Sequence, residues 1–222
     1  MSKILVLLFG SLFLFGCMQM EWRGGMVPHV GIKNGDSTAA QTITNNKNNF
    51  RPNSSNWSQF RGPNRDGVSP QQGVKIKWNQ QPDPRWKIPS GEGHSSVVVN
   101  EDTVFTLEQN GNEETLFARK LSNGKEQWKF SIDTKWDDMM SGTGPRSTPT
   151  LHNGEIFTLF SNGLLCCVNA QSGKLNWKTK TIDESYKFPE WGISCSPLIW
   201  NNLIVLNQGG ENSAAHAYDI VS

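Results

Sequence analysis

Net charge is nearly absent from this chain of 222 residues. It has 21 Lys and Arg against 20 Asp and Glu, which gives a formal net charge of +1. Such a balance provides no large field of one sign that would attract nucleic acid or acidic substrates. We therefore expect no nucleic-acid partner.

Helical periodicity and catalytic motifs are missing as well. Outside the extreme N-terminus, no window of useful length has apolar residues at helical spacing. The chain contains no GxSxG, HExxH or CxxC motif and no GxGxxG that opens a helix. Its four His residues, at 29, 94, 152 and 216, show no metal-ligand spacing. We expect an all-β protein and name no catalytic residue and no metal site.

What the chain does have is a repeat of about fifty residues. The segments LFARKLSNGKEQW at 116–128 and LCCVNAQSGKLNW at 165–177 align on a Gly, and AHAYDIVS at 215–222 begins a third copy. Before each copy, two short apolar runs flank a polar turn. Short runs of Val, Ile, Leu and Phe between Asn and Gly turns are typical of strands. A period of this size, with four strands per unit, predicts the blades of a β-propeller.

A Trp closes each unit. Trp86, Trp128 and Trp177 each start an outer strand, and they explain part of the excess of nine Trp over two Tyr. An indole buries a large area and needs one partner for its N–H. We expect these three side chains to be structural, filling the wedge between adjacent blades and donating to a neighbouring backbone carbonyl.

The repeat resembles the pyrroloquinoline-quinone-like (PQQ-like) β-propeller repeat, whose hallmark is AxDxxTGxxxW. CVNAQSGKLNW at 167–177 follows this pattern closely, and ARKLSNGKEQW at 118–128 follows it more loosely. NWSQFRGPNRDGVS at 56–69 is similar to the opening motif of secreted bacterial members. The resemblance implies a quinoprotein alcohol dehydrogenase-like propeller of four-stranded blades, with about three blades in 56–222. Closed propellers have typically four to eight blades, so we expect an N-terminal fragment that continues beyond the chain end.

The resemblance allows two functions of different classes. Quinoprotein alcohol dehydrogenases bind the quinone and Ca²⁺, whereas the outer-membrane lipoprotein scaffold of the β-barrel assembly machine has no cofactor. A shared fold does not choose between them. We favour a lipid-anchored binding or scaffold module without a cofactor. The alternative is an oxidoreductase that depends on pyrroloquinoline quinone and calcium, whose ligands we do not find in these three blades.

The N-terminus resembles a lipoprotein signal. Lys3 precedes an apolar run at 4–15, which is too short to span a bilayer and fits a signal-peptide core. The LFGC sequence that ends at Cys17 resembles a bacterial lipobox, which implies a signal peptide at 1–16 and lipidation of Cys17. The alternative is an ordinary secretory signal with an incidental Cys.

By family analogy Met18, which is not Asp, favours the outer membrane, on its periplasmic or cell-surface face. We expect 17–55 to be the lipidated Cys and a disordered polar tether, because its Asn-, Ser- and Thr-rich stretch has little apolar surface to bury. The partners would then be the membrane, through the lipid, and other envelope proteins.

Three cysteines remain besides Cys17. Cys166 and Cys167 are adjacent, and the dehydrogenases of the superfamily place a vicinal disulfide over the quinone. In the repeat alignment, however, Cys167 takes the small packed position of Ala118, and Cys166 takes a variable position within the same strand. We expect ordinary strand positions and leave open a disulfide between Cys195 and one of the pair.

A binding surface is expected on the long connections before the inner strands, since such connections cluster at one end of a propeller. The connections at 133–146 and 183–194 combine aromatic and charged residues, which is the composition of recognition sites. We name Trp136, Arg146 and Trp191 as candidate contact residues. The alternative is that the aromatic side chains of these loops pack on one another.

Overall fold

The computed structural model describes residues 18–21, 29–32, 56–73, 77–209 and 215–220, and the chain divides into two compact units, Met1–Asn49 and Phe50–Ser222. In the first unit, β1 (Met18–Glu21) pairs antiparallel with β2 (His29–Ile32). This strand pair lies in 17–55, where the sequence predicted a disordered tether. The rest of that range, the signal peptide 1–16 and Cys17 lie outside the described residues.

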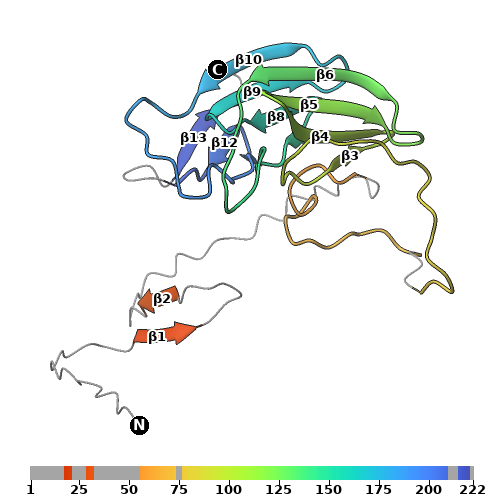
Figure 1. Cartoon of the computed structure of the whole chain (residues 1–222), viewed down its shortest axis with the longest axis horizontal. Helices are drawn as coiled ribbons and strands as arrows, with labels where there is room; N and C mark the ends of the chain where they lie inside the picture. Colours follow the sequence, from red (N-terminus) through yellow and green to blue (C-terminus); the bar gives the residue numbers. More distant parts are fainter. Residues whose placement is uncertain (1–17, 22–28, 33–55, 74–76, 210–214, 221–222) are drawn as a thin grey trace, which may run out of the picture. The chain divides into compact units, whose positions relative to one another are not determined.

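The second unit contains three antiparallel sheets that follow one another along the chain, coloured from yellow-green to blue in Figure 1. Blade A consists of β3 (Val98–Asn100), β4 (Thr103–Asn110), β5 (Glu113–Lys120) and β6 (Glu126–Asp133). Blade B consists of β7 (Thr150–His152), β8 (Glu155–Leu159), β9 (Leu164–Asn169) and β10 (Leu175–Lys180). Blade C consists of β11 (Leu198–Trp200), β12 (Leu203–Leu206) and β13 (His216–Asp219). The described residues contain no helix, and the predicted all-β architecture of four-stranded blades is confirmed.

Two-residue turns join the first two strands of each blade. Glu101, Asn153 and Asn201 begin these turns with φ of 51°, 49° and 52°. Asn tolerates this left-handed backbone conformation, and Asn153 is followed by Gly154 with φ 79°, as in a type I′ turn. The three turns produce the same register, with Val98 opposite Phe105, Thr150 opposite Phe157 and Leu198 opposite Val205.

The hydrophobic core lies between neighbouring blades. Successive residues of a strand point to opposite faces of a sheet, so blade B contributes to two cores. Its Ile156, Phe160, Cys166 and Val168 pack on Phe105, Leu107, Leu116 and Ala118 of blade A. Its Phe157, Leu159, Leu165 and Cys167 pack on Ile193, Ile204 and Leu206 on the blade C side. Full burial of one such side chain stabilises by about 1.5–3 kcal/mol.

The strand order gives each blade two ends. The turn end holds the tight turns 101–102, 153–154 and 201–202, together with the Gly turns 121–125 and 170–174. The connection end holds the long links 134–149 and 181–197, which lead from the outer strand of one blade to the inner strand of the next. Recognition surfaces are disproportionately found on loops that a rigid scaffold positions.

Residues 56–67, the axial segment, contact the innermost strands of blades A and B and the residues just before the innermost strand of blade C. Trp57 exchanges two backbone hydrogen bonds with Val99 of β3, at 2.8 and 2.9 Å. The carbonyl of Ser58 accepts from the N–H of Leu151 in β7, at 2.8 Å. The first strand of each blade is the inner one, so this segment lies across the strands that line the propeller axis.

Arg65 extends the axial segment to blade C. Its guanidinium donates to the carbonyls of Pro197 (3.2 Å) and Ser196 (3.4 Å), just before β11. Gly62 allows the turn between these contacts, because its φ is 80° and a Cβ there would lie 2.7 Å from the Trp57 ring. One short segment therefore links blades A, B and C.

Candidate binding surface at the connection end

The blade Trp residues lie at the seams between sheets. Trp128 donates from Nε1 to the carbonyl of Ala170 in the next blade, at 3.1 Å, and its ring covers Gly173. Trp86, which precedes blade A, makes the equivalent bond to the carbonyl of Leu121, at 2.8 Å, and its ring covers Gly124. Trp177 packs in the core between blades B and C, with its ring centroid 6.0 Å from that of Phe157.

Trp136 joins the two long connections. Its ring lies over Gly192, where a Cβ would be only 2.7 Å away, and its centroid is 5.8 Å from that of Phe188. Its backbone N–H donates to Oε1 of Gln109, at 2.8 Å. The indole N–H is buried without a hydrogen-bond partner. Much of this side chain therefore serves to hold one connection against the other.

Arg146 is turned into its own loop. Its Nη2 donates to the Ser141 carbonyl (3.0 Å), the Ser141 hydroxyl (2.6 Å) and the Gly142 carbonyl (3.1 Å). On the other side of the turn, Oδ1 of Asp138 accepts from the N–H groups of Met140 (2.9 Å) and Ser141 (2.6 Å). Hydrogen bonds from Ser141, with a smaller contribution from Arg146, hold the pKa of Asp138 below its usual range. These contacts fix the loop from 138 to 146.

Apolar side chains project from the connections that are fixed in this way. Met139 is 98% exposed and Met140 is 80% exposed, while Phe188 (43%) and Trp191 (45%) project from the other connection. Phe188 is held between Trp136 and Tyr186, whose ring it meets edge-on at 5.2 Å. We call Met139, Met140, Phe188 and Trp191 the connection-end patch.

The predicted contact residues therefore have different places. Trp191 projects from the surface, whereas the half-buried side chains of Trp136 and Arg146 support the loops. The sequence prediction did not select Met139 and Met140 as contact residues. The sequence feature that could have identified them is a pair of adjacent apolar residues in a turn, preceded by Asp138 and followed by Ser141 and Gly142.

Acidic residues outnumber basic ones in the two connections that carry the connection-end patch. The two connections contain the acidic residues Asp137, Asp138, Asp183, Glu184 and Glu190, and the basic residues Lys135, Arg146 and Lys187. The cationic group of Arg146 is directed at carbonyls inside its loop. The surroundings of the patch are therefore acidic, although the whole chain has a net charge of +1.

Two acidic side chains are buried near the same end of blade A. Oε2 of Glu114 accepts from the N–H of Ser161, at 2.9 Å, while its Oε1 has no partner, and burial raises the pKa of this carboxyl. Glu108 forms an ion pair with Arg119, at 2.7 Å. Burial alone would raise the pKa of Glu108, but hydrogen bonds from Thr106, Gly91 and Arg119 hold it below its ordinary value. Both groups lie inside the fold and serve its packing.

The three cysteines in the described part of the chain, Cys166, Cys167 and Cys195, are free thiols, so no disulfide joins Cys195 to the adjacent pair there. Cys166 packs towards blade A and Cys167 towards blade C, so the adjacent pair points to opposite faces of one sheet. Burial raises the pKa of both from 9.0 to about 12. In the described part of the chain, no three His, Cys, Asp or Glu side chains come together as a metal site. The described segments also lack a helix with the length and apolar character that a membrane crossing requires.

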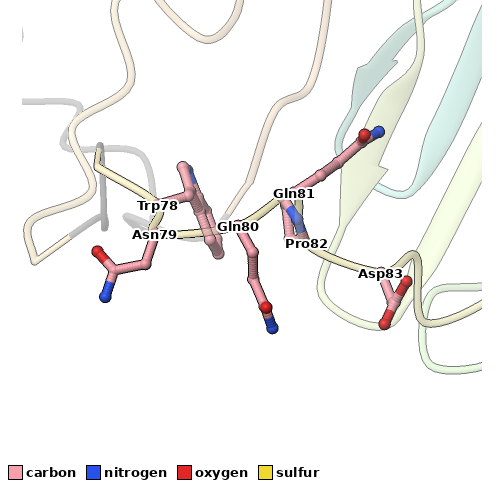
Figure 2. Close-up of a pocket in the computed structure, with 6 residues that line it drawn as sticks. All are labelled: Trp78, Asn79, Gln80, Gln81, Pro82 and Asp83. Carbon is pink, nitrogen blue, oxygen red and sulfur yellow. The ribbon is translucent and has the colours of Figure 1, made fainter.

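Figure 2 shows a hollow of about 480 Å³ lined by Trp78, Asn79, Gln80, Gln81, Pro82 and Asp83. All six residues are consecutive in the chain. The fold therefore brings no distant groups together there, and we assign no site to it.

Comparison with known proteins supports the class that the fold defines. Residues 123–221 match the family model described as outer membrane protein assembly factor BamB. A quinohemoprotein alcohol dehydrogenase from Pseudomonas putida HK5 superposes with a TM-score of 0.56 at 18% identity, covering 75% of this chain and 25% of that structure. At this identity the likeness concerns the fold alone. Residues 123–221 are thus similar to this family, and the fold is that of β-propeller blades, as the sequence predicted.

Other solved structures match over shorter parts. BamB from Moraxella catarrhalis superposes with a TM-score of 0.41 at 12% identity, covering 56% of this chain and 32% of that one. A europium-containing methanol dehydrogenase gives 0.45 at 18%, covering 60% and 23%. The chain thus spans about a quarter to a third of the length of these structures. Comparison with curated protein sequences gives no match.

Proposed function

We propose that this chain is a lipid-anchored binding or scaffold module of the bacterial envelope, which holds a partner protein at the connection-end patch. The observation that carries this proposal is the exposure of Met139, Met140, Phe188 and Trp191 on loops whose backbones are internally fixed. The free energy of the system falls when apolar surface leaves water, and clustered exposed apolar side chains mark interaction sites. A fixed loop also loses little conformational entropy on binding.

The anchor rests on the N-terminal sequence and on the family match. An apolar segment followed by LFGC supports export and lipidation of Cys17. The matching family model is described as an outer membrane protein assembly factor, which supports the outer membrane and a partner among envelope proteins. The propeller then faces the periplasm or the cell surface.

The proposed module works without a cofactor. The backbone of the inner strands is hydrogen-bonded to the axial segment through Trp57, Ser58 and Arg65. The adjacent thiols of Cys166 and Cys167 point to opposite faces of their sheet. Both observations support the cofactor-free proposal. The second candidate, an oxidoreductase using pyrroloquinoline quinone and calcium, is favoured by the likeness to the alcohol dehydrogenase fold.

Photocrosslinking in cells tests the proposal. A photoreactive phenylalanine analogue replaces Met139 in the protein with its own N-terminus, and a matched control replaces the exposed Lys125 at the turn end. We expect an adduct with one envelope protein from position 139 and none from position 125. Adducts of equal yield from both positions, or none from 139, would refute a partner at this patch.

Two further measurements address the anchor and the cofactor. Incorporation of a labelled fatty acid should be lost in Cys17→Ala, together with membrane partitioning, and its retention would refute lipidation of Cys17. Titration of the protein with pyrroloquinoline quinone and Ca²⁺ should leave the quinone absorbance spectrum unchanged. Stoichiometric binding would favour the oxidoreductase.

A further inference from the structure

The chemistry of the connection-end patch defines a class of partner, and this inference rests on the function proposed above. We propose that the patch binds an extended protein segment in which apolar side chains alternate with Lys or Arg. The apolar side chains would contact Met139, Met140, Phe188 and Trp191, and the cations would lie beside the surrounding carboxylates.

The first argument is the division between rigid and adaptable groups. Phe188 is fixed between Trp136 and Tyr186, and the Tyr186 hydroxyl donates to the carbonyl of Gln208, at 2.8 Å. An aromatic side chain held in this way presents apolar area at little entropic cost. Met139 and Met140 are unbranched and extend into solvent. Met side chains repack around apolar groups of different shape. The patch therefore requires apolar side chains and does not require one particular sequence.

The second argument is charge. The two connections have four exposed acidic residues, Asp137, Asp183, Glu184 and Glu190, against two exposed basic ones, Lys135 and Lys187. The cation of Arg146 is already directed at the carbonyls of Ser141 and Gly142. A basic partner therefore meets a complementary surface, whereas an acidic peptide or an anionic lipid surface meets repulsion. Charges around an apolar centre set specificity and association rate more than affinity.

The third argument is the alternating direction of side chains along an extended segment. Successive side chains of an extended chain point to opposite sides. A segment of alternating apolar and basic residues can therefore turn its apolar side to the patch. Its Lys and Arg side chains start on the opposite side, and their long stems let the charged groups bend over the edges of the segment towards the carboxylates. The exposed apolar surface lies on two neighbouring connections that Trp136 joins through Gly192 and Phe188, so one bound segment can span both.

Fluorescence anisotropy with defined peptides tests this inference on the purified full-length protein. The probes are three labelled twelve-residue peptides, of alternating Leu and Lys, Leu and Glu, and Ser and Lys. We expect the Leu–Lys peptide to bind at least tenfold more tightly than either of the others, with an affinity that falls as salt is added. Equal binding of the Leu–Glu peptide would overturn the charge argument. Equal binding of the Ser–Lys peptide would overturn the apolar argument.

Variants test the place of binding. Met139→Ser/Met140→Ser should weaken binding of the Leu–Lys peptide tenfold or more without changing the circular dichroism spectrum, because both side chains lie in solvent. Asp137→Lys/Glu190→Lys should reverse the preference to the Leu–Glu peptide, a result that mere loss of structure would not produce. Unchanged binding in the first variant, or an unchanged preference in the second, would refute this site.

The two proposals fail separately. In one outcome, a partner protein crosslinks to position 139 through a segment that lacks Lys and Arg. This result would support the proposed binding module and refute the proposal that the bound segment is basic. Selective peptide binding without any crosslink in cells would support the chemistry of the patch and count against the scaffold function.

Discussion

Replacing Gly173 by Ala should show how much the packing of Trp128 at the seam between blades A and B contributes to the stability of the fold. Gly173 has φ 71°, and a Cβ built on it would lie 2.7 Å from the ring atoms of Trp128. Real Cβ atoms do not approach this closely, so the indole must move. Moving it strains the hydrogen bond from Nε1 to the Ala170 carbonyl and loosens the packing of the ring against Phe105, 5.8 Å away.

The loss of folding stability expected for Gly173→Ala has two parts. Holding Ala in a left-handed conformation costs roughly 1–2 kcal/mol. Displacing a packed ring adds about 1–3 kcal/mol, as overpacking does elsewhere. Gly154→Ala is the matched control, because Gly154 has φ 79° but nothing lies within 4 Å of its Cβ position. It should show only the first part, so the two variants should differ by about 1–3 kcal/mol.

Urea unfolding followed by circular dichroism measures both variants against the unchanged protein. The difference between Gly173→Ala and Gly154→Ala should appear as a lower midpoint at an unchanged slope. It should shrink when Trp128 is replaced by Leu in both backgrounds, since the clash is then removed. Equal destabilisation by the two glycine substitutions would refute the claim that the Trp128 ring depends on Gly173.

Three further predictions concern buried side chains of the fold. Burial raises the pKa of Glu114, so the folded state binds the carboxyl proton more tightly than the unfolded state does. The free energy of unfolding should therefore fall as pH rises from the unfolded pKa of about 4.3 through the folded pKa. Glu114→Gln should remove this pH dependence of stability. Cys166 and Cys167, with pKa values of about 12, should react with iodoacetamide at pH 8 roughly a thousandfold more slowly than an exposed thiol, as mass spectrometry of native protein can measure. Arg119→Met should cost about 3–5 kcal/mol in urea unfolding by leaving Glu108 buried without its cation, and the double change with Glu108→Leu should cost less.

Each of these expectations has a contrary result. A pH profile of stability that is the same with Glu and Gln at 114 would mean that the carboxyl is not buried in the folded protein. Rapid native labelling of either thiol would contradict its place in the core. A double change at 108 and 119 that costs as much as Arg119→Met alone would show that the two side chains are not coupled.

The sequence predicted much of the fold because the signals of a repeated blade are local. Alternating apolar residues between Asn and Gly turns define strands, and the Trp that recurs at the end of each unit places Trp86 and Trp128 at equivalent seams. The same alternation explains why Cys166 and Cys167 point to different cores. A side chain in a strand has only two faces to choose from, and its neighbours in sequence decide which.

The loops and the axial segment follow a different rule. The guanidinium of Arg146 donates to carbonyls of its own loop, and Trp136 rests on Gly192, 56 positions further along the chain. Arg65 donates to Ser196 across a separation of 131 residues. Irregular backbone has no periodicity that assigns its side chains to a face, so contacts between distant segments decide their directions. The sequence alone determined propeller blades with Trp seams. Only the tertiary structure decided which residues form its exposed surface, because that depends on which segments pack together.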